Sequence, residues 1–144
     1  MRKVRDILKI LFVCIKNASR SPMAEAMLKM SAKRGIQVCS AGIKPGKEVN
    51  EQAVKAMREI GCDLSGHKPR HISAFSNIKF DYVAKMDVPD LGDMVTAKWI
   101  ADWDIPDPAQ GGAAEYRKIR QMIADKIRAE LPHLLTQQPK KNRA

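Results

Sequence analysis

Two residues near the amino terminus have types and spacing that suit chemistry on an anion. Cys14 and Arg20 are separated by five residues, Ile15-Lys16-Asn17-Ala18-Ser19. Residues 7–13 have the apolar, β-branched character of a buried strand, and Pro22 suits the first turn of a helix. Amide groups at a helix start attract anions and stabilise a thiolate, and an arginine can bind two oxygens of a tetrahedral oxyanion. The sequence therefore predicts an anion-binding loop that contains a nucleophile, Cys14.

The other residues of this segment are candidates for holding the anion. Asn17 belongs to a residue type that tolerates a left-handed turn, which a tight loop around an anion needs. The hydroxyls of Ser19 and Ser21 can donate to the thiolate or to the oxyanion. The alternative is a buried structural Cys14 with a surface Arg20, because buried cysteine is common. We expect the oxyanion to be bound by Ile15, Lys16, Asn17, Ala18, Ser19, Arg20 and Ser21.

A second group that suits this chemistry is the carboxyl group of Asp107, which lies in a short acidic and proline-containing segment, residues 104–108. Transfer of a phosphoryl group to a thiolate leaves an alkoxide or phenoxide, and a carboxylic acid beside that oxygen can protonate it. The same group can then take a proton from water in the second step. Aspartate and proline are also common in turns, so an ordinary loop is the alternative.

The segment around Cys14 resembles the C-x5-R-S signature of the low-molecular-weight protein tyrosine phosphatases and of the arsenate reductases that share their fold. The resemblance covers Cys14, Asn17, Arg20, Ser21 and the Pro-Met-Ala-Glu run that follows. Shorter matches lie at Ser-Ala-Gly 40–42, His-x-x-Arg 67–70, the Asp-Tyr to Met-Asp segment 81–87 and Asp-Pro 107–108.

The resemblance implies a role for each matched residue. Cys14 would attack phosphorus, Arg20 and the loop amides would bind its oxygens, and Asp107 would act as acid and then as base. Ser21 would assist the thiolate as leaving group. Ser40 would hydrogen-bond near Asn17 and keep the loop preformed, although a turn serine that satisfies its own backbone is nearly as good an interpretation. His67 could support the loop as a donor, with an exposed loop histidine as the equal alternative.

Two departures from the family pattern bear on the substrate. Phosphatases of this family usually carry tyrosines after Asp-Pro, whereas Ala109 and Gln110 follow here, and the run 103–109 looks more like the reductase branch. Thioredoxin-coupled reductases, however, carry two relay cysteines near the end of the third strand, where this chain has none, and no cysteine follows Cys62. Reduction would then need an external thiol to break a cysteine–arsenic adduct.

These features lead to one main hypothesis and two alternatives. We expect cysteine-dependent hydrolysis of phosphomonoesters, on a phosphorylated protein or a small molecule, through a cysteinyl-phosphate intermediate. The first alternative is an arsenate reductase that uses arsenate and an external thiol reductant, such as glutathione, mycothiol or a thioredoxin-type protein. The second alternative is an oxyanion-binding module without catalysis.

Composition restricts the other classes of function. Three cysteines without paired spacing make neither a disulfide framework nor a zinc site, so we expect a cytoplasmic protein without metal or cofactor. The net charge of +10 is spread along the chain, and aromatic residues make up only 5%, so nucleic acid is not an expected partner. No apolar run approaches membrane-spanning length, and no feature indicates an oligomeric state.

The pattern of apolar residues and breakers predicts how these groups are positioned. Strands are expected over residues 7–13, 37–42, 80–87 and 96–101, and helices over 21–34, 50–60, 88–94 and 112–135. Asn50 is the expected cap of the second helix. This alternation predicts one α/β domain, a three-layer sandwich with a four-stranded parallel sheet, flavodoxin-like winding and helices on both faces. The domain would span 7–135, between a basic arm, 1–6, and a basic disordered tail, 136–144. Ligands of such sheets bind at the carboxyl ends of the strands, where Cys14 lies.

Overall fold

The computed structural model describes residues 7–108 and 110–136 of the 144-residue chain. The predicted arm, 1–6, and residues 137–144 of the predicted tail lie outside the described residues. The strands are β1 (Leu8–Cys14), β2 (Ile36–Gly42), β3 (Lys79–Phe80), β4 (Tyr82–Met86), β5 (Thr96–Ala97) and β6 (Ile100–Trp103). The α-helices are α1 (Arg20–Ser31), α2 (Glu51–Arg58) and α3 (Ala113–Glu130). Short 3-10 helices are η2 (Ile72–Phe75), η3 (Gly92–Met94) and η4 (Pro132–Leu134).

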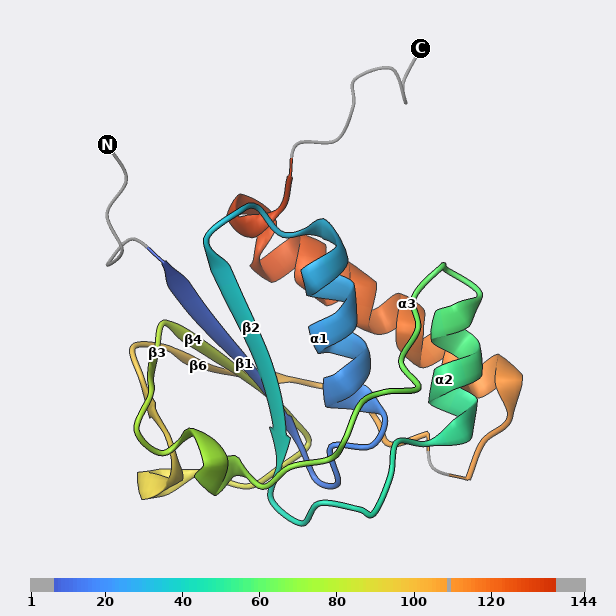
Figure 1. Ribbon diagram of the computed structural model, residues 1–144, viewed down its shortest axis with the longest axis horizontal. Helices are drawn as coiled ribbons and strands as arrows, with labels where there is room; N and C mark the ends of the chain where they lie inside the picture. Colours follow the sequence, from blue (N-terminus) through green and yellow to red (C-terminus); the bar gives the residue numbers. More distant parts are fainter. Residues whose placement is uncertain (1–6, 109, 137–144) are drawn as a thin grey trace.

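A parallel sheet of four strands, in the order β2-β1-β4-β6, forms the middle of the domain (Figure 1). The central strand β1 is buried from residue 10 to residue 14, as its apolar sequence predicts. Its last residue, Cys14, pairs with Gly42 at the end of β2. Because all four strands run in one direction, their carboxyl ends meet at one edge of the sheet. The predicted α/β domain with a four-stranded parallel sheet is confirmed.

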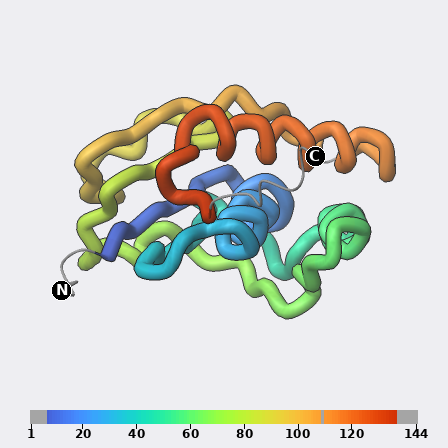
Figure 2. The backbone as a smooth tube through the Cα atoms, turned by 90° about the horizontal axis from the view of Figure 1, so that it is seen from above, coloured from blue at the N-terminus to red at the C-terminus, as the bar shows by residue number. Residues whose placement is uncertain are grey.

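One face of the sheet is covered by α1 and α3, which pack against each other (Figure 2), while α2 packs against α3. Alternate residues of β1, namely Ile10, Phe12 and Cys14, face this layer, as the period of a strand requires. The Trp103 ring lies over Phe12 with 5.3 Å between ring centroids. Burial of each such large side chain stabilises the fold by roughly 1.5–3 kcal/mol. This core fixes Cys14 against the start of α1.

The opposite face, toward which Leu11 and Val13 point, is covered by thinner structure. Its apolar contacts come from η2 and from residues 80–95, and β3 and β5 form a separate two-stranded sheet there. Helices on both faces are therefore present, but on this face they are short 3-10 helices. The predicted helix 88–94 reduces to η3, because Pro89 lacks an amide donor and Gly92 has a left-handed backbone with φ 53°.

The predicted third and fourth strands are each divided in two. Residue 81 interrupts the predicted strand 80–87, because the Asp81 carboxylate accepts a hydrogen bond from the Lys9 amide at 2.8 Å. The Asp81 amide in turn donates to the Lys9 carbonyl at 2.8 Å. The predicted strand 96–101 is interrupted at residues 98–99: β5 pairs with β3 outside the main sheet, and β6 forms the edge of the main sheet and extends to Trp103.

The two longer helices end earlier than predicted. α1 stops at Ser31 because Ala32 takes an extended backbone and forms an isolated antiparallel bridge with Leu135. α3 stops at Glu130, and Pro132, which cannot continue a helix, begins η4. The Thr136 amide donates to the Ser31 carbonyl at 2.8 Å, so the first residue of the predicted tail is hydrogen-bonded to α1.

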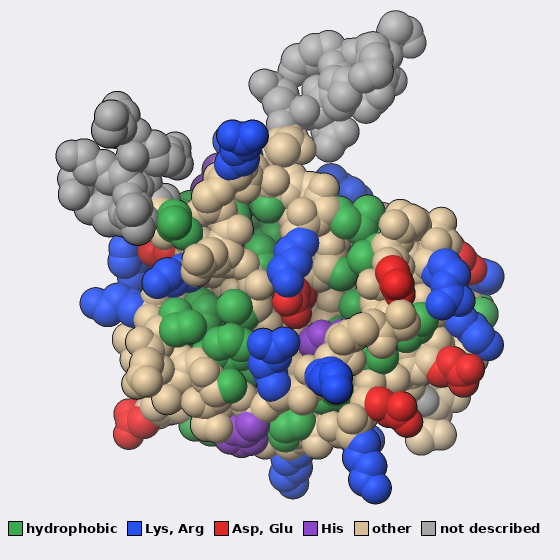
Figure 3. All heavy atoms as spheres, in the orientation of Figure 1, with side chains coloured by type: hydrophobic (Ala, Val, Ile, Leu, Met, Phe, Trp, Pro, Cys, Tyr) green, Lys and Arg blue, Asp and Glu red, His purple; other side chains and the backbone are tan. Residues whose placement is uncertain are grey.

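Positive charge is dispersed over one face of the molecule (Figure 3). On the face drawn in Figure 3, Lys and Arg side chains stand singly or in small groups among acidic and apolar ones. Within residues 7–108 and 110–136, no helix has the length and apolar character that crossing a bilayer requires.

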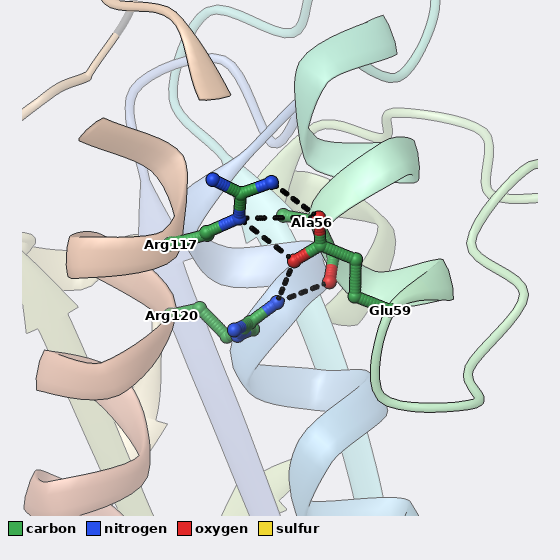
Figure 4. Close-up of polar contacts among 4 residues, drawn as sticks. All are labelled: Ala56, Glu59, Arg117 and Arg120. Carbon is green, nitrogen blue, oxygen red and sulfur yellow. Dashed lines mark hydrogen bonds and ion pairs between the residues drawn. The ribbon is translucent and has the colours of Figure 1, made fainter. Parts of the chain in front are cut away.

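An ionic clamp joins α2 to α3 (Figure 4). Asn50 caps α2, accepting from the Gln52 and Ala53 amides, and Glu59 follows the helix at its other end. The Glu59 carboxylate accepts hydrogen bonds from Arg117 at 2.8–3.1 Å and from Arg120 at 2.8 Å. Hydrogen bonds from these two guanidinium groups lower the pKa of Glu59 to about 2. The clamp fixes α2, and with it the segment that leads out of the sheet's carboxyl edge.

Replacing Glu59 by Gln should therefore remove a pH-dependent contribution to stability. Because the folded-state pKa lies below the unfolded one, this contribution is complete above about pH 4.5 and is lost as the pH falls toward 2. Urea unfolding midpoints should be lower for Glu59→Gln than for the wild type at pH 7 and should converge with it near pH 2. Glu130→Gln, at an exposed carboxylate 3.9 Å from Lys126, is the control and should follow the wild type. A constant difference across this pH range would contradict the assignment.

Candidate active site

A cavity of about 60 Å³ lies at the carboxyl edge of the sheet. Its lining consists of Cys14, Lys16, Ala18, Ser19, Arg20, Asn50 and Asp107. All of these except Asn50, which was expected only as a helix cap, are site residues predicted from the sequence. The loop after β1 and the Asp-Pro segment after β6 thus meet at one cavity.

Three predicted loop residues do not line this cavity. Asn17 and Ser21 are fully buried beneath it, and Ile15 packs against the apolar cluster on the opposite face of the sheet. Their side chains therefore shape the loop from below, whereas those of the lining residues surround the space that an anion would fill.

The loop 14–19 is held from outside by the segment 43–50. Carbonyl oxygens of the loop accept hydrogen bonds of 2.8–3.3 Å from that segment, in the pairs Cys14–Ile43, Ile15–Lys44, Lys16–Gly46 and Ala18–Asn50. Because these carbonyl oxygens point outward, the amide groups of the loop can point inward, toward a bound anion. The outer segment therefore shapes the loop for a negatively charged ligand.

Gly42, at the end of β2, allows this close packing. A Cβ atom at this position would lie 2.6 Å from the Ile15 carbonyl oxygen and 2.9 Å from the Asn17 amide nitrogen. Both are backbone atoms of the loop, so no side-chain rotation would relieve the contact. The loop can take this course only because residue 42 has no side chain.

Asn17 is the anchor beneath the loop. Its backbone is left-handed, with φ 53°, and its side chain is completely buried. Its Nδ2 donates to the hydroxyls of Ser21 at 2.8 Å and Ser40 at 2.9 Å. Its Oδ1 accepts from the Arg70 amide and from His67 Nε2, both at 3.0 Å. The amide therefore uses two donor and two acceptor positions, which is its full capacity.

This pattern determines where the Ser21 proton goes. Because the Ser21 Oγ accepts from Asn17, its own hydrogen is available to another acceptor. Cys14 Sγ lies 2.9 Å away, closer than the Ala41 carbonyl oxygen at 3.5 Å. The hydroxyl is thus positioned to donate to the sulfur, an interaction that stabilises a thiolate.

The same network extends behind the loop to Ser40 and His67. The Ser40 hydroxyl accepts from Asn17 and donates to Glu25 at 2.5 Å, which places it in contact with the loop as the resemblance implied. His67 Nε2 also lies 3.2 Å from the Asn17 carbonyl oxygen, so a ring proton there can be shared between two Asn17 oxygens. Burial lowers the pKa of His67, which favours the neutral ring. Both residues therefore support Asn17 and do not reach the cavity.

Arg20 is almost completely buried and is oriented by the backbone. Its Nη1 donates to the carbonyl oxygens of Met86 and Ile105, both at 3.1 Å. Those carbonyls lie at the end of β4 and just beyond β6, so the sheet itself orients the guanidinium. With Nη1 engaged, the Nε and Nη2 donors remain for an oxyanion.

Two carboxylates flank this guanidinium. Asp107 lies 3.8 Å from Nη2 and Asp87 3.9 Å from Nη1, and both side chains are well exposed. Asp107 lines the cavity together with Cys14. Asp87 has a left-handed backbone, with φ 61°, at the turn that follows β4. The arrangement thus combines a thiol, a guanidinium and a carboxylate around one small space.

The other two cysteines lie elsewhere. Cys39 pairs in register with Leu11 on the face of the sheet opposite to Cys14, and burial raises the pKa of its thiol. Cys62 lines a separate groove of about 590 Å³ beside α1, and burial raises the pKa of its thiol as well. Neither residue belongs to the lining of the cavity around Cys14.

Comparison with known proteins identifies the family of this chain. The model of the family described as low molecular weight phosphotyrosine protein phosphatase matches residues 9–143. The chain belongs to this family. It is therefore an enzyme of the type that includes these phosphatases and the arsenate reductases of the same fold, and the predicted resemblance is confirmed.

Its curated relatives include arsenate reductases. Arsenate reductase 1 of Staphylococcus epidermidis is 35% identical over 120 residues, which cover 79% of this chain and 88% of the relative. A glutaredoxin arsenate reductase of Synechocystis sp. is 29% identical over 124 residues, covering 83% of this chain and 92% of the relative.

Solved structures share the fold over most of its length. An arsenate reductase in the phosphate-binding state superposes with a TM-score of 0.75 and 28% identity, covering 88% of this chain and 98% of that one. Vibrio vulnificus Wzb in complex with benzylphosphonate gives a TM-score of 0.75 and 25% identity, covering 89% of this chain and 99% of that one.

Sequence reasoning missed two members of the site. The Glu25 carboxylate accepts a hydrogen bond from Ser40 and forms an ion pair with Lys29 at 2.7 Å. In the sequence Glu25 stood out only as the last residue of the Pro-Met-Ala-Glu run. Asn50 was predicted as a cap, yet it also lines the cavity. A buried polar network carries little local signal, because its partners come from separate strands and loops.

The contact at Gly42 gives a test of how the loop is held. Gly42→Ala should force the loop away from β2, weaken phosphate binding and lower the free energy of unfolding by roughly the 1–3 kcal/mol of an overpacked site. Gly46→Ala is the matched control, since its Cβ would meet no atom closer than 3.9 Å. Calorimetric titration with phosphate and urea unfolding measure both effects. Equal behaviour of the two variants would show that the close approach at residue 42 does not shape the loop.

Proposed function

We propose that this protein is an arsenate reductase that uses an external thiol. The observation that carries the proposal is that, among the described residues, Cys14 is the only cysteine that lines an oxyanion-sized cavity, beside Arg20 and Asp107. A volume of about 60 Å³ is far below the roughly 300–1,000 Å³ of pockets that enclose drug-sized ligands. Within the described part of the chain, no aromatic side chain lines the cavity. A small tetrahedral oxyanion suits it better than an aryl ester does. The names of the relatives in Staphylococcus epidermidis and Synechocystis sp. support the same activity.

The first step is attack of the Cys14 thiolate on arsenic(V). A sulfur–arsenic bond forms and one arsenic–oxygen bond breaks, and the departing oxygen leaves as water after protonation by Asp107. Arg20 and the loop amides bind the remaining oxygens, and Ser21 donates to the sulfur. Lys16, at the exposed rim, adds positive charge that attracts the anion.

The second step needs a thiol that the cavity itself does not provide. An external thiolate attacks the Cys14 sulfur, so that a disulfide forms, the sulfur–arsenic bond breaks and its electron pair reduces arsenic(V) to arsenic(III). A second external thiol then releases Cys14. The sum is arsenate and two thiols giving arsenite, one disulfide and water. Cys39 and Cys62 are poorly suited to this role, because both thiols have raised pKa values and lie outside the cavity.

Phosphomonoester hydrolysis is the second candidate, and a specific observation favours it. The fold matches Vibrio vulnificus Wzb in complex with benzylphosphonate over nearly its whole length. With a phosphomonoester, Cys14 would attack phosphorus, Asp107 would protonate the leaving oxygen, and the same carboxylate would activate water against the cysteinyl phosphate.

A paired assay on one preparation tests the proposal. Arsenite formation with glutathione and glutaredoxin, or with thioredoxin and its reductase, is measured beside hydrolysis of para-nitrophenyl phosphate. We expect arsenite from the wild type, Cys39→Ser and Cys62→Ser, none from Cys14→Ser, and a rate lowered by roughly 10²–10⁴ in Asp107→Asn. Phosphatase turnover without arsenite would replace the proposal by the second candidate. Loss of arsenite formation in Cys39→Ser or Cys62→Ser would show an internal relay and contradict the external thiol.

A further inference from the structure

The hydroxyl oxygen of Tyr116 is a buried polar atom of the core that has no role in the hydrogen-bond network around Asn17. Tyr116, on α3, is completely buried, and its hydroxyl has no hydrogen-bond partner within the described part of the chain. Leaving a buried hydroxyl without a partner costs about 1–3 kcal/mol. Such a group in a native structure calls for a functional or structural reason.

The surroundings of this hydroxyl are those of the cavity wall. Burial raises the pKa of the Tyr116 phenol, and hydrogen bonding by the nearby Ser19 side chain lowers it, although the two hydroxyls do not meet the geometry of a formed hydrogen bond. The Asp107 carboxylate raises this pKa and the Arg20 guanidinium lowers it. These three groups all line the cavity that contains Cys14. The Tyr116 ring packs in the same apolar cluster as Cys14, between the sheet and α3. The phenol thus approaches the cavity from its buried side.

The hydroxyl of Ser19 can point its hydrogen in more than one direction. It occupies the N-cap position of α1, yet its side chain makes no capping hydrogen bond. Its backbone carbonyl accepts from the Met23 amide at 2.9 Å, so the residue is fixed while its hydroxyl can rotate. A hydroxyl has one hydrogen and two acceptor positions, so a donor from behind directs its hydrogen forward.

We propose that Tyr116 is a positioning residue for the bound oxyanion, acting through Ser19. When an anion occupies the cavity, the phenol donates its hydrogen to the Ser19 Oγ, and the Ser19 hydrogen turns toward the anion. A phenol is a better donor than an alcohol, which fixes this direction. This inference rests on the proposed function only in requiring that the cavity binds an oxyanion, whichever reaction follows.

The experiment is a double-mutant cycle on phosphate affinity, measured by calorimetric titration with Tyr116→Phe, Ser19→Ala and the double variant. Tyr116→Phe removes one oxygen and should weaken phosphate binding roughly 3- to 10-fold, the effect of one hydrogen bond. In the Ser19→Ala background the same change should have no further effect. The melting temperature should not fall in Tyr116→Phe, because the hydroxyl makes no formed hydrogen bond within the described residues.

Tyr82→Phe is the matched control, since Tyr82 is the only other tyrosine and its hydroxyl accepts from Trp103 Nε1 at 3.0 Å. It should lower stability and leave phosphate affinity unchanged. Unchanged affinity in Tyr116→Phe, or an equal loss in the presence and absence of the Ser19 hydroxyl, would overturn the positioning role alone. Absence of phosphate and arsenate binding by the wild type would overturn the proposed function as well.

Discussion

The active-site loop depends on the side chain of one buried asparagine. Asn17 sits in a left-handed backbone conformation that costs energy for a residue with a side chain, and it is held there by four side-chain hydrogen bonds. An amide with only half of its hydrogen bonds would destabilise the loop more than an apolar residue in this position, because each buried polar atom without a partner carries its full desolvation cost. The completeness of the network is therefore what makes a single loop conformation stable before any anion arrives.

The directions of the hydrogen bonds around Cys14 follow from the Asn17 side chain. Asn17 donates to Ser21, which leaves the Ser21 hydrogen for the Cys14 sulfur, and the outward carbonyls leave amides for the anion. Arg20 is oriented separately, by carbonyl oxygens at the ends of two strands. The thiol and the guanidinium are thus set by two independent parts of one sheet edge. Such preorganised donors can stabilise an anionic transition state without rearranging during the reaction.

Local patterns predicted the parts of the structure that local forces determine. The strand that leads to Cys14, the helix that contains Pro22 in its first turn and the cap at Asn50 are encoded within short segments, and each forms where it was predicted within a few residues. The break at Asp81 could not be predicted, because it depends on hydrogen bonds to Lys9 across the sheet. The approach of Tyr116 to the cavity wall arises in the same way, from the packing of α3 on α1.

The most direct test of the anchoring role of Asn17 is to measure oxyanion binding by the Asn17→Gly variant. Glycine keeps the left-handed conformation available and removes only the amide side chain, so it separates the hydrogen-bond network from the backbone requirement. Calorimetric titration with phosphate should show a large loss of affinity relative to the wild type, together with lower stability of the loop to proteolysis. Wild-type affinity in Asn17→Gly would contradict the account, since the loop would then be formed without its anchor.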